Sequence, residues 1–245
     1  MRIVKAPSDL GCLGRNKTKN APDEIIKNLR DYTNDFDVDL VEINETNIDE
    51  TDKRIEAKDG DIFIGGDHSI TYSCFKNFSK KYKNPGLLIF DAHADCMDNF
   101  KITHEDWLRV LIEEGFVKPG NVTIVGLRRI EKDELIYLKE KGIKYFLMEN
   151  ISNINDVSDV VMERVRNYDG LYVSIDIDVV DPAFAPGTGM IEPGGFTSRG
   201  LLYFVKRLRL LKNLKRVDLV EVSHEKDINE MTVRLGARIL YEFMR

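Results

Sequence analysis

The sequence contains little of what would mark a secreted or membrane-spanning protein. Its three cysteines, Cys12, Cys74 and Cys96, show no paired spacing, and this odd, sparse count favours a reducing compartment. No apolar run reaches roughly 18 residues, so we expect no membrane span. The first residues, MRIVKAPSDLG, lack the apolar core of a signal peptide, and we therefore expect a cytoplasmic protein.

The chain also lacks a net positive charge, long linkers and internal repeats. Its net charge of −6 argues against nucleic acid or an anionic membrane surface as a partner, and it suits a small cationic ligand. With 245 residues, 42% of them hydrophobic, the chain can bury a sizeable core. Because no Pro/Gly/Ser-rich stretch divides it, we expect residues 1–245 to form a single domain.

What the chain does contain is a regular alternation of short apolar runs and amphipathic charged runs. The apolar runs predict strands at Ile3–Lys5, Asp39–Glu42, Ile62–Ile64, Leu87–Phe90, Val122–Val125, Lys144–Leu147, Leu171–Ile175 and Arg216–Val222. The amphipathic runs predict helices at Asp23–Tyr32, Ser69–Lys81, His104–Glu114, Ile130–Lys141, Ile154–Asn167, Ser198–Leu211 and Asn229–Phe243. This alternation predicts an α/β fold with three αβα layers around a mostly parallel central sheet.

Acidic and histidine residues gather directly after four of the predicted strands. The segments are GGDHS at 65–69, DAHAD at 91–95, DIDVVDP at 176–182 and EVSH at 221–224. In open parallel sheets, ligands bind beyond the carboxyl ends of the strands. The four strand ends therefore predict one shared site.

The spacing within these segments favours a metal site. In an extended segment alternate residues face one side, so the ionisable residues of each segment should converge. Carboxylates in one cleft repel each other unless a cation lies between them. The set offers six ligands, which suits two divalent ions that share bridging carboxylates: His68, Asp91, His93, Asp95, Asp176 and Asp178. Carboxylates and imidazoles without a thiolate favour Mn²⁺, although Co²⁺, Ni²⁺, Fe²⁺ or Zn²⁺ could use the same ligands.

Each segment taken alone also has an ordinary interpretation. DAHAD could be a salt-bridged strand end, DID before proline a capped loop, and GGDH a turn. Three such segments, each at the end of an apolar run, favour the metal site over these interpretations. Cys96 should point away from Asp95 and is not expected to be a ligand.

These motifs resemble those of the ureohydrolase family, which includes arginase, agmatinase and formimidoylglutamase. The matching segments are GGDHS (65–69), DAHAD (91–95) and SIDIDVVDPAFAPGTG (174–189). Weaker matches extend the resemblance over nearly the whole chain: NAPDEI (20–25), VGLR (125–128), EPGGFTSRG (192–200) and VEVS (220–223). The resemblance is closest to agmatinase-like members, and it implies an arginase-like αβα fold with the active site at the carboxyl ends of the strands.

The resemblance also implies two manganese ions per chain. One ion would be held by His68, Asp91, Asp95 and Asp176. The other would be held by four residues of which two are shared with the first: Asp91, His93, Asp176 and Asp178. Asp91 and Asp176 would then bridge the two ions.

Three catalytic roles follow from the same resemblance. Asp95 would orient the attacking hydroxide, Glu221 would receive the guanidinium of the substrate, and His104 would shuttle a proton to the leaving amine. From the residues alone, His104 could instead be a surface histidine at a helix start. Glu221 could instead form a structural ion pair with Arg234 or Arg238.

The departures from the family pattern lie on the substrate side. Met97 stands where arginases carry polar side chains that grip an α-amino acid. Glu105 follows His104 where the family has glycine, and Met190 and His224 replace other usual residues. We therefore expect cleavage of a cationic guanidino compound rather than arginine, with agmatine giving urea and putrescine as the leading case.

Several alternatives stay open from the sequence. The same metal site could serve a formimidoylglutamase, an arginase or another amidine hydrolase. The chain could also be a catalytically silent paralogue or a single-metal deacetylase of related architecture. Asp181 is expected in a turn, and Arg128 is expected to brace a loop or a subunit contact rather than to bind an anionic substrate group. The resemblance further implies a homo-oligomer, a trimer or a hexamer.

Overall fold

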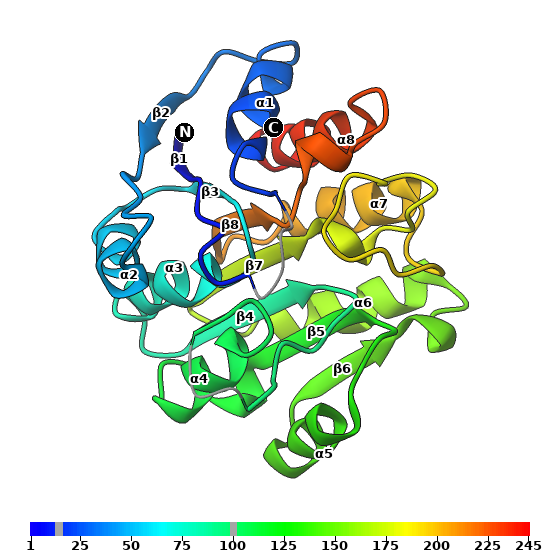
Figure 1. The fold of residues 1–245 in the computed structure, drawn as a ribbon. Coiled ribbons are helices and arrows are strands. Elements are labelled where there is room, and N and C mark those ends of the chain that lie inside the picture. Colours follow the sequence, from blue (N-terminus) through cyan, green and yellow to red (C-terminus); the bar gives the residue numbers. More distant parts are fainter. Residues whose placement is uncertain (13–16, 99–101) are drawn as a thin grey trace.

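The centre of the protein is one eight-stranded sheet, seen in a computed structural model that describes residues 1–12, 17–98 and 102–245 (Figure 1). The strands are β1 (Arg2–Ala6), β2 (Asp37–Leu40), β3 (Ile62–Gly65), β4 (Pro85–Phe90), β5 (Val122–Leu127), β6 (Lys144–Leu147), β7 (Gly170–Asp176) and β8 (Leu214–Val220). Their order in the sheet is β2-β1-β3-β8-β7-β4-β5-β6. Every pair of neighbouring strands is parallel.

Helices cover both faces of this sheet. They are α1 (Ala21–Leu29), α2 (Ile48–Glu56), α3 (Ile70–Ser79), α4 (Trp107–Glu113), α5 (Lys132–Lys141), α6 (Ile154–Val165), α7 (Ser198–Leu208) and α8 (Met231–Met244). Helices α1, α6, α7 and α8 pack on one face, and α2, α3, α4 and α5 pack on the other (Figure 1). The predicted three-layer αβα fold is confirmed. Among the described residues, no helix is both long and apolar enough to cross a lipid bilayer.

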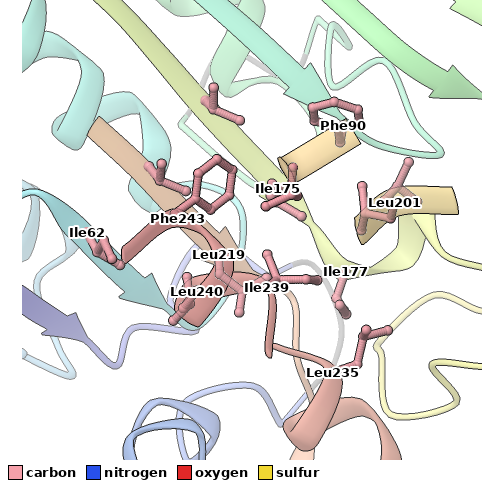
Figure 2. Packing of buried hydrophobic residues seen from close by; sticks show 14 of the residues in the cluster. Ile62, Phe90, Ile175, Ile177, Leu201, Leu219, Leu235, Ile239, Leu240 and Phe243 are labelled. Atoms are coloured by element: carbon pink, nitrogen blue, oxygen red, sulfur yellow. The ribbon is translucent and has the colours of Figure 1, made fainter. Parts of the chain in front are cut away.

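Strands β3, β4 and β5 are almost wholly apolar because both of their faces are buried. In β4, Leu88 and Phe90 point to the side of α7 and α8, whereas Leu87 and Ile89 point to the opposite layer. Figure 2 shows the first layer, in which side chains of α8 pack on those of the central strands: Leu235, Ile239, Leu240 and Phe243 on α8, and Ile62, Phe90, Ile175 and Leu219 on the strands. Burying one such side chain contributes about 1.5–3 kcal/mol. Burial on both faces explains why these strands are continuous apolar runs in the sequence.

Two helices differ from the prediction. Helix α2 was not predicted, because its sequence IDETDKRIE buries only Thr51 and Ile55 and has almost no apolar stripe. The helix predicted from His104 begins at Trp107 instead. Residues before it form a turn in which the backbone N–H and hydroxyl of Thr103 both donate to Asp106 Oδ1, at 2.6 and 2.9 Å.

Two strand predictions were displaced. The strand predicted at Asp39–Glu42 is Asp37–Leu40, and the last strand ends at Val220 rather than Val222. Glu221 follows with a positive φ of 60°, which turns the chain away from the sheet. The four strands that carry the ionisable segments, β3, β8, β7 and β4, are neighbours at the centre of the sheet. Their carboxyl ends therefore bring the segments together.

Candidate metal centre

Turns, rather than extended backbone, aim the acidic side chains into one site. Strand β4 ends at Phe90, and the loop that follows places Asp95 at a positive φ of 51°. The backbone N–H of His93 donates to Asp91 Oδ1 at 2.7 Å. After β7, a short 3₁₀ turn repeats this geometry, and the N–H of Asp178 donates to Asp176 Oδ1 at 2.8 Å. The side chains converge as predicted, but the expected alternation along an extended segment was wrong.

The first group of possible ligands surrounds His68, which follows β3. Its Nδ1 lies 3.0 Å from Asp91 Oδ2, 3.0 Å from Asp95 Oδ2 and 3.3 Å from Asp176 Oδ2. All four side chains are buried. Ligand atoms of His68, Asp91 and Asp176 lie within 4.8 Å of one another, which is close enough to hold one metal ion.

A second group lies beside the first and shares Asp91 with it. His93 Nδ1 lies 2.9 Å from Asp178 Oδ2 and 3.5 Å from Asp91 Oδ1. Ligand atoms of Asp91, His93 and Asp178 also lie within 4.8 Å of one another. Asp178 Oδ1 accepts the backbone N–H of Ala92 at 3.1 Å, so its other oxygen faces His93. The structure thus brings all six predicted ligands together in two adjoining groups.

The proton positions around His68 fit a cation between these groups. Ser174 Oγ donates to Asp218 Oδ1 at 2.6 Å, so it accepts the His68 Nε2–H at 3.0 Å. This tautomer leaves a lone pair on Nδ1, which faces three carboxylates. Within the described residues, His68 Nδ1 and Asp91 Oδ2 are buried without a hydrogen-bond partner. A nitrogen lone pair and carboxylate oxygens in such contact are the donor set of a divalent metal.

The acids control the protonation of both imidazoles when no metal is bound. Burial by itself lowers the pKa of His68, but the carboxylates of Asp176, Asp91 and Asp95 around the imidazole together outweigh burial and hold that pKa well above the usual range. Burial also lowers the pKa of His93, but the charges and hydrogen bonds of Asp178 and Asp91 together outweigh burial and raise it. Burial, together with the charges of Asp178 and Asp91, raises the pKa of Asp176. A metal ion would have to displace the protons that these groups hold.

Glu221 and His104 form a second polar pair next to the ligands. His104 Nδ1 lies 3.4 Å from Glu221 Oε1, and the same oxygen accepts the backbone N–H of His68 at 2.9 Å. Burial lowers the pKa of His104, but the hydrogen bond and charge of Glu221 outweigh burial and raise it to about 9. His104 is therefore no surface histidine. Arg234 and Arg238, the alternative partners for Glu221, pair with Glu230 and Glu242 instead.

One cavity of about 260 Å³ joins the ligand groups, His104 and Glu221. Met97 and Met190 also line it, as expected for a site that lacks the polar grip of an arginase. The remaining charged lining residues are Glu105, Arg129, Glu131 and Glu134. Because the Arg129 guanidinium lies 3.5 Å from Glu131, it is partly neutralised by that acid.

Four other residues singled out in the sequence lie away from the ligand groups or have structural contacts. Arg128 donates to the backbone carbonyls of Asp178, Val179, Gly126 and Glu192, so it braces the loop after β7 as expected. Asp181 accepts three backbone N–H groups in a turn. His224 lies outside the cavity lining, in a separate group with Glu24 and Glu230. The Cys96 thiol contacts the carbonyl of Ala94, away from the ligands.

Some residues that support the site were missed in the sequence. Asp218 is fully buried within β8 and accepts hydroxyl donors from Thr71, Tyr172 and Ser174. Trp107 Nε1 donates to Asp95 Oδ2 at 2.7 Å. Asp218 could have been noticed as an acid inside the apolar run RVDLV, because a buried carboxylate requires hydrogen-bond donors. The contact of Trp107 depends on packing between segments and has no local signal.

Comparison with known proteins agrees with this architecture. The crystal structure of arginase from Bacillus subtilis matches with a TM-score of 0.91 and 25% sequence identity, over 100% of this chain and 98% of that chain. An arginase of Staphylococcus aureus (strain COL) is 30% identical over 235 residues, which is 89% of this chain and 76% of the relative. An agmatinase of Bacillus subtilis (strain 168) is 34% identical over 185 residues, which is 74% of this chain and 61% of the relative.

The fold and the ligand groups at its strand ends define an arginase-like αβα hydrolase. The model of the arginase family matches residues 1–245. The chain belongs to the arginase family, and the resemblance to ureohydrolases drawn from its motifs is confirmed.

Proposed function

We propose that this protein is a binuclear manganese ureohydrolase that cleaves agmatine to urea and putrescine. The observation that carries the proposal is a pair of ligand groups that share Asp91 and adjoin Glu221 and His104. The proposed ligands of one ion are His68, Asp91, Asp95 and Asp176. Those of the other are Asp91, His93, Asp176 and Asp178, so that Asp91 and Asp176 bridge.

Bound metal ions would supply Lewis acidity and make water a nucleophile near neutral pH. The protein's own groups would do the rest. Glu221 would accept charge-assisted hydrogen bonds from the substrate guanidinium and fix its register. Asp95 would accept a hydrogen bond from the attacking water and orient it. Glu221 helps to raise the pKa of His104 to about 9, so His104 would be protonated near neutral pH and would deliver a proton to the leaving amine.

The cavity supports a substrate with an aminoalkyl tail. Met97 and Met190 offer apolar walls, which suit a methylene chain and cannot bind an α-amino acid head. Outside the catalytic groups, Arg129 is the one basic lining residue in the described part of the chain, against the acidic Glu105, Glu131 and Glu134, so a distal ammonium is favoured. Agmatine, a decarboxylated arginine, has this structure.

Arg129 supports one second candidate, an amidine or guanidine with a distal carboxylate, such as a formimino amino acid. Its side chain is exposed and lies at the cavity. The two candidates predict opposite effects of charge reversal. Arg129→Glu should raise kcat/KM for a substrate with a distal ammonium and lower it for one with a distal carboxylate. Glu105→Lys should have the opposite effect on both substrates.

The test is a substrate panel with defined metals. Purified protein loaded with Mn²⁺ would be assayed for urea and, separately, for formamide and ammonia on agmatine, arginine, guanidino acids and formiminoglutamate. Urea from agmatine supports the proposal, and formamide from formiminoglutamate, with the amine as leaving group, supports the second candidate. No product from any compound, at full metal occupancy, would favour a silent paralogue. A count of one bound metal would favour the deacetylase class.

We also propose that residues 1–245 form one domain and that the protein is a cytoplasmic homo-oligomer. The single sheet, to which all eight strands belong, supports the first part. The trimer or hexamer rests on the family resemblance. Light scattering on the purified protein would give the mass, and a monomer mass would exclude both assemblies.

A further inference from the structure

The only tryptophan of the chain, Trp107, contacts the candidate metal centre through Asp95. Trp107 is the first residue of α4 and is fully buried. Because it is not among the residues that line the cavity, it has no surface to offer a substrate. It occupies a position three residues after His104, in a segment that departs from the family pattern.

One indole contacts two of the proposed ligands. Its N–H donates to Asp95 Oδ2 at 2.7 Å, and that oxygen lies 3.0 Å from His68 Nδ1. The centroid of its ring lies 4.7 Å from that of the His68 imidazole, with the planes tilted by 41°. Rotation of either ligand would therefore meet the buried indole. His68 and Asp95 both belong to the proposed ligand set of the first ion, and Asp95 is absent from that of the second.

The backbone conformation at Asp95 is also linked to the start of α4. Asp95 holds a φ of 51°, a left-handed conformation that costs energy for a residue other than glycine. The N–H of Leu108 donates to the Asp95 carbonyl at 3.3 Å, and the N–H of Met97 donates to the Glu105 carbonyl at 2.9 Å. The turn that carries Asp95 is thus tied to the start of α4, where Trp107 stands.

We propose that Trp107 is a positioning residue that orients Asp95 and His68 for one of the two metal ions. This inference rests on the proposed binuclear function. The indole N–H fixes which way the Asp95 carboxylate points, and the ring face limits rotation of the His68 imidazole. Outer contacts of this kind typically change metal affinity about 10- to 100-fold when they are removed.

The sharpest test removes the N–H and keeps the shape of the side chain. Because the chain has a single tryptophan, global replacement by benzothienylalanine changes one position and puts sulfur where the N–H was. Trp107→Phe is the genetic counterpart. Mn²⁺ would be titrated into each metal-free protein by calorimetry. We expect affinity for one of the two ions to fall about 10- to 100-fold, with the other unchanged.

A matched control removes a hydrogen-bond donor from a buried aromatic ring elsewhere. Tyr168 OH donates to the Gly120 carbonyl at 3.4 Å, at the opposite end of the strands. Tyr168→Phe should leave both Mn²⁺ affinities unchanged. In the native protein, paramagnetic Mn²⁺ should also quench the Trp107 emission as the first site fills, and this readout needs no variant.

The outcomes separate the inference from the proposed function. Selective weakening of one ion in the benzothienylalanine protein supports the inference. Unchanged Mn²⁺ affinities in that protein, or native emission that Mn²⁺ binding does not alter, overturn it. Native protein that binds no Mn²⁺ overturns the proposed function itself, and this inference with it.

Discussion

At the scale of single residues, the proposed metal centre depends most on Asp91 and its neighbours. Asp91 belongs to both ligand groups, and its side chain accepts the backbone N–H of His93 in the turn that presents this histidine. The same carboxylate would therefore serve both the proposed metal ions and the local backbone shape.

Asp178→Asn should reduce ureohydrolase activity at least about 100-fold, since it removes a proposed ligand rather than an outer contact. His93→Ala should do the same. Asp181→Asn makes the same change of charge in the next turn, where the carboxylate only accepts backbone N–H groups. Rates measured at saturating Mn²⁺ should drop in the first two variants and stay within a few-fold in the third. Similar losses in all three would contradict the assignment of ligands.

His104 predicts a pH dependence of stability in the metal-free protein. Its pKa is raised to about 9 by Glu221, against about 6.5 in the unfolded chain. The native state thus holds the proton more tightly, and the stabilisation is complete below about pH 6.5 and lost as pH rises through about 9. We expect His104→Asn to cost about 2–3 kcal/mol at pH 6 and less at pH 10.

Denaturant unfolding of both proteins across this pH range would measure that difference. In a Glu221→Gln background the same substitution should lose most of its pH dependence, because the group that contributes most to raising the pKa of His104 has lost its charge. If His104→Asn lowers the free energy of unfolding by the same amount from pH 6 to pH 10 in protein that retains Glu221, the pair does not titrate as described.

At the scale of elements, most of the strands could be predicted from the sequence, and so could the four strand ends that form the candidate site. This succeeded because strands buried on both faces are continuous apolar runs, and because each ionisable segment directly follows one. Helix α2 could not be predicted in this way, since it buries only Thr51 and Ile55 and lacks an apolar pattern. The turn at Asp95 and the contact of Trp107 were not predictable, because both depend on how the start of α4 packs on the irregular loop that precedes it.

Arg128 shows how one side chain sets the position of a loop. Its guanidinium donates to four backbone carbonyls that join the end of β5 to the loop after β7. Arg128→Met should lower the free energy of unfolding by about 3 kcal/mol, because buried carbonyls lose charged donors. Arg129→Met, at the exposed neighbour, should change it by less than about 0.5 kcal/mol. Equal effects in a denaturant titration would refute the bracing role.

At the scale of the whole molecule, the metal ions should stabilise the fold from its centre. The proposed ligands follow β3, β4 and β7, so a bound ion would link parts of the chain that are far apart in sequence. A ligand at 100 times its dissociation constant adds about 2.7 kcal/mol per site. Mn²⁺ should therefore raise the melting temperature, and a chelator should reverse the shift.

The control for this prediction is Asp178→Asn, which should show a smaller shift at the same Mn²⁺ concentration. Scanning calorimetry should also show a single transition if residues 1–245 are one domain, as proposed. An unchanged melting temperature in saturating Mn²⁺ would mean that the clustered carboxylates and imidazoles are stable without a cation.

The most direct test of the central claim is urea release from agmatine, measured together with the metal content of the same sample. The account predicts urea and putrescine in equal amounts from protein that holds two Mn²⁺ per chain, and loss of both products after chelation. Protein with two bound Mn²⁺ that releases no urea from agmatine, arginine or any other guanidino compound would contradict it.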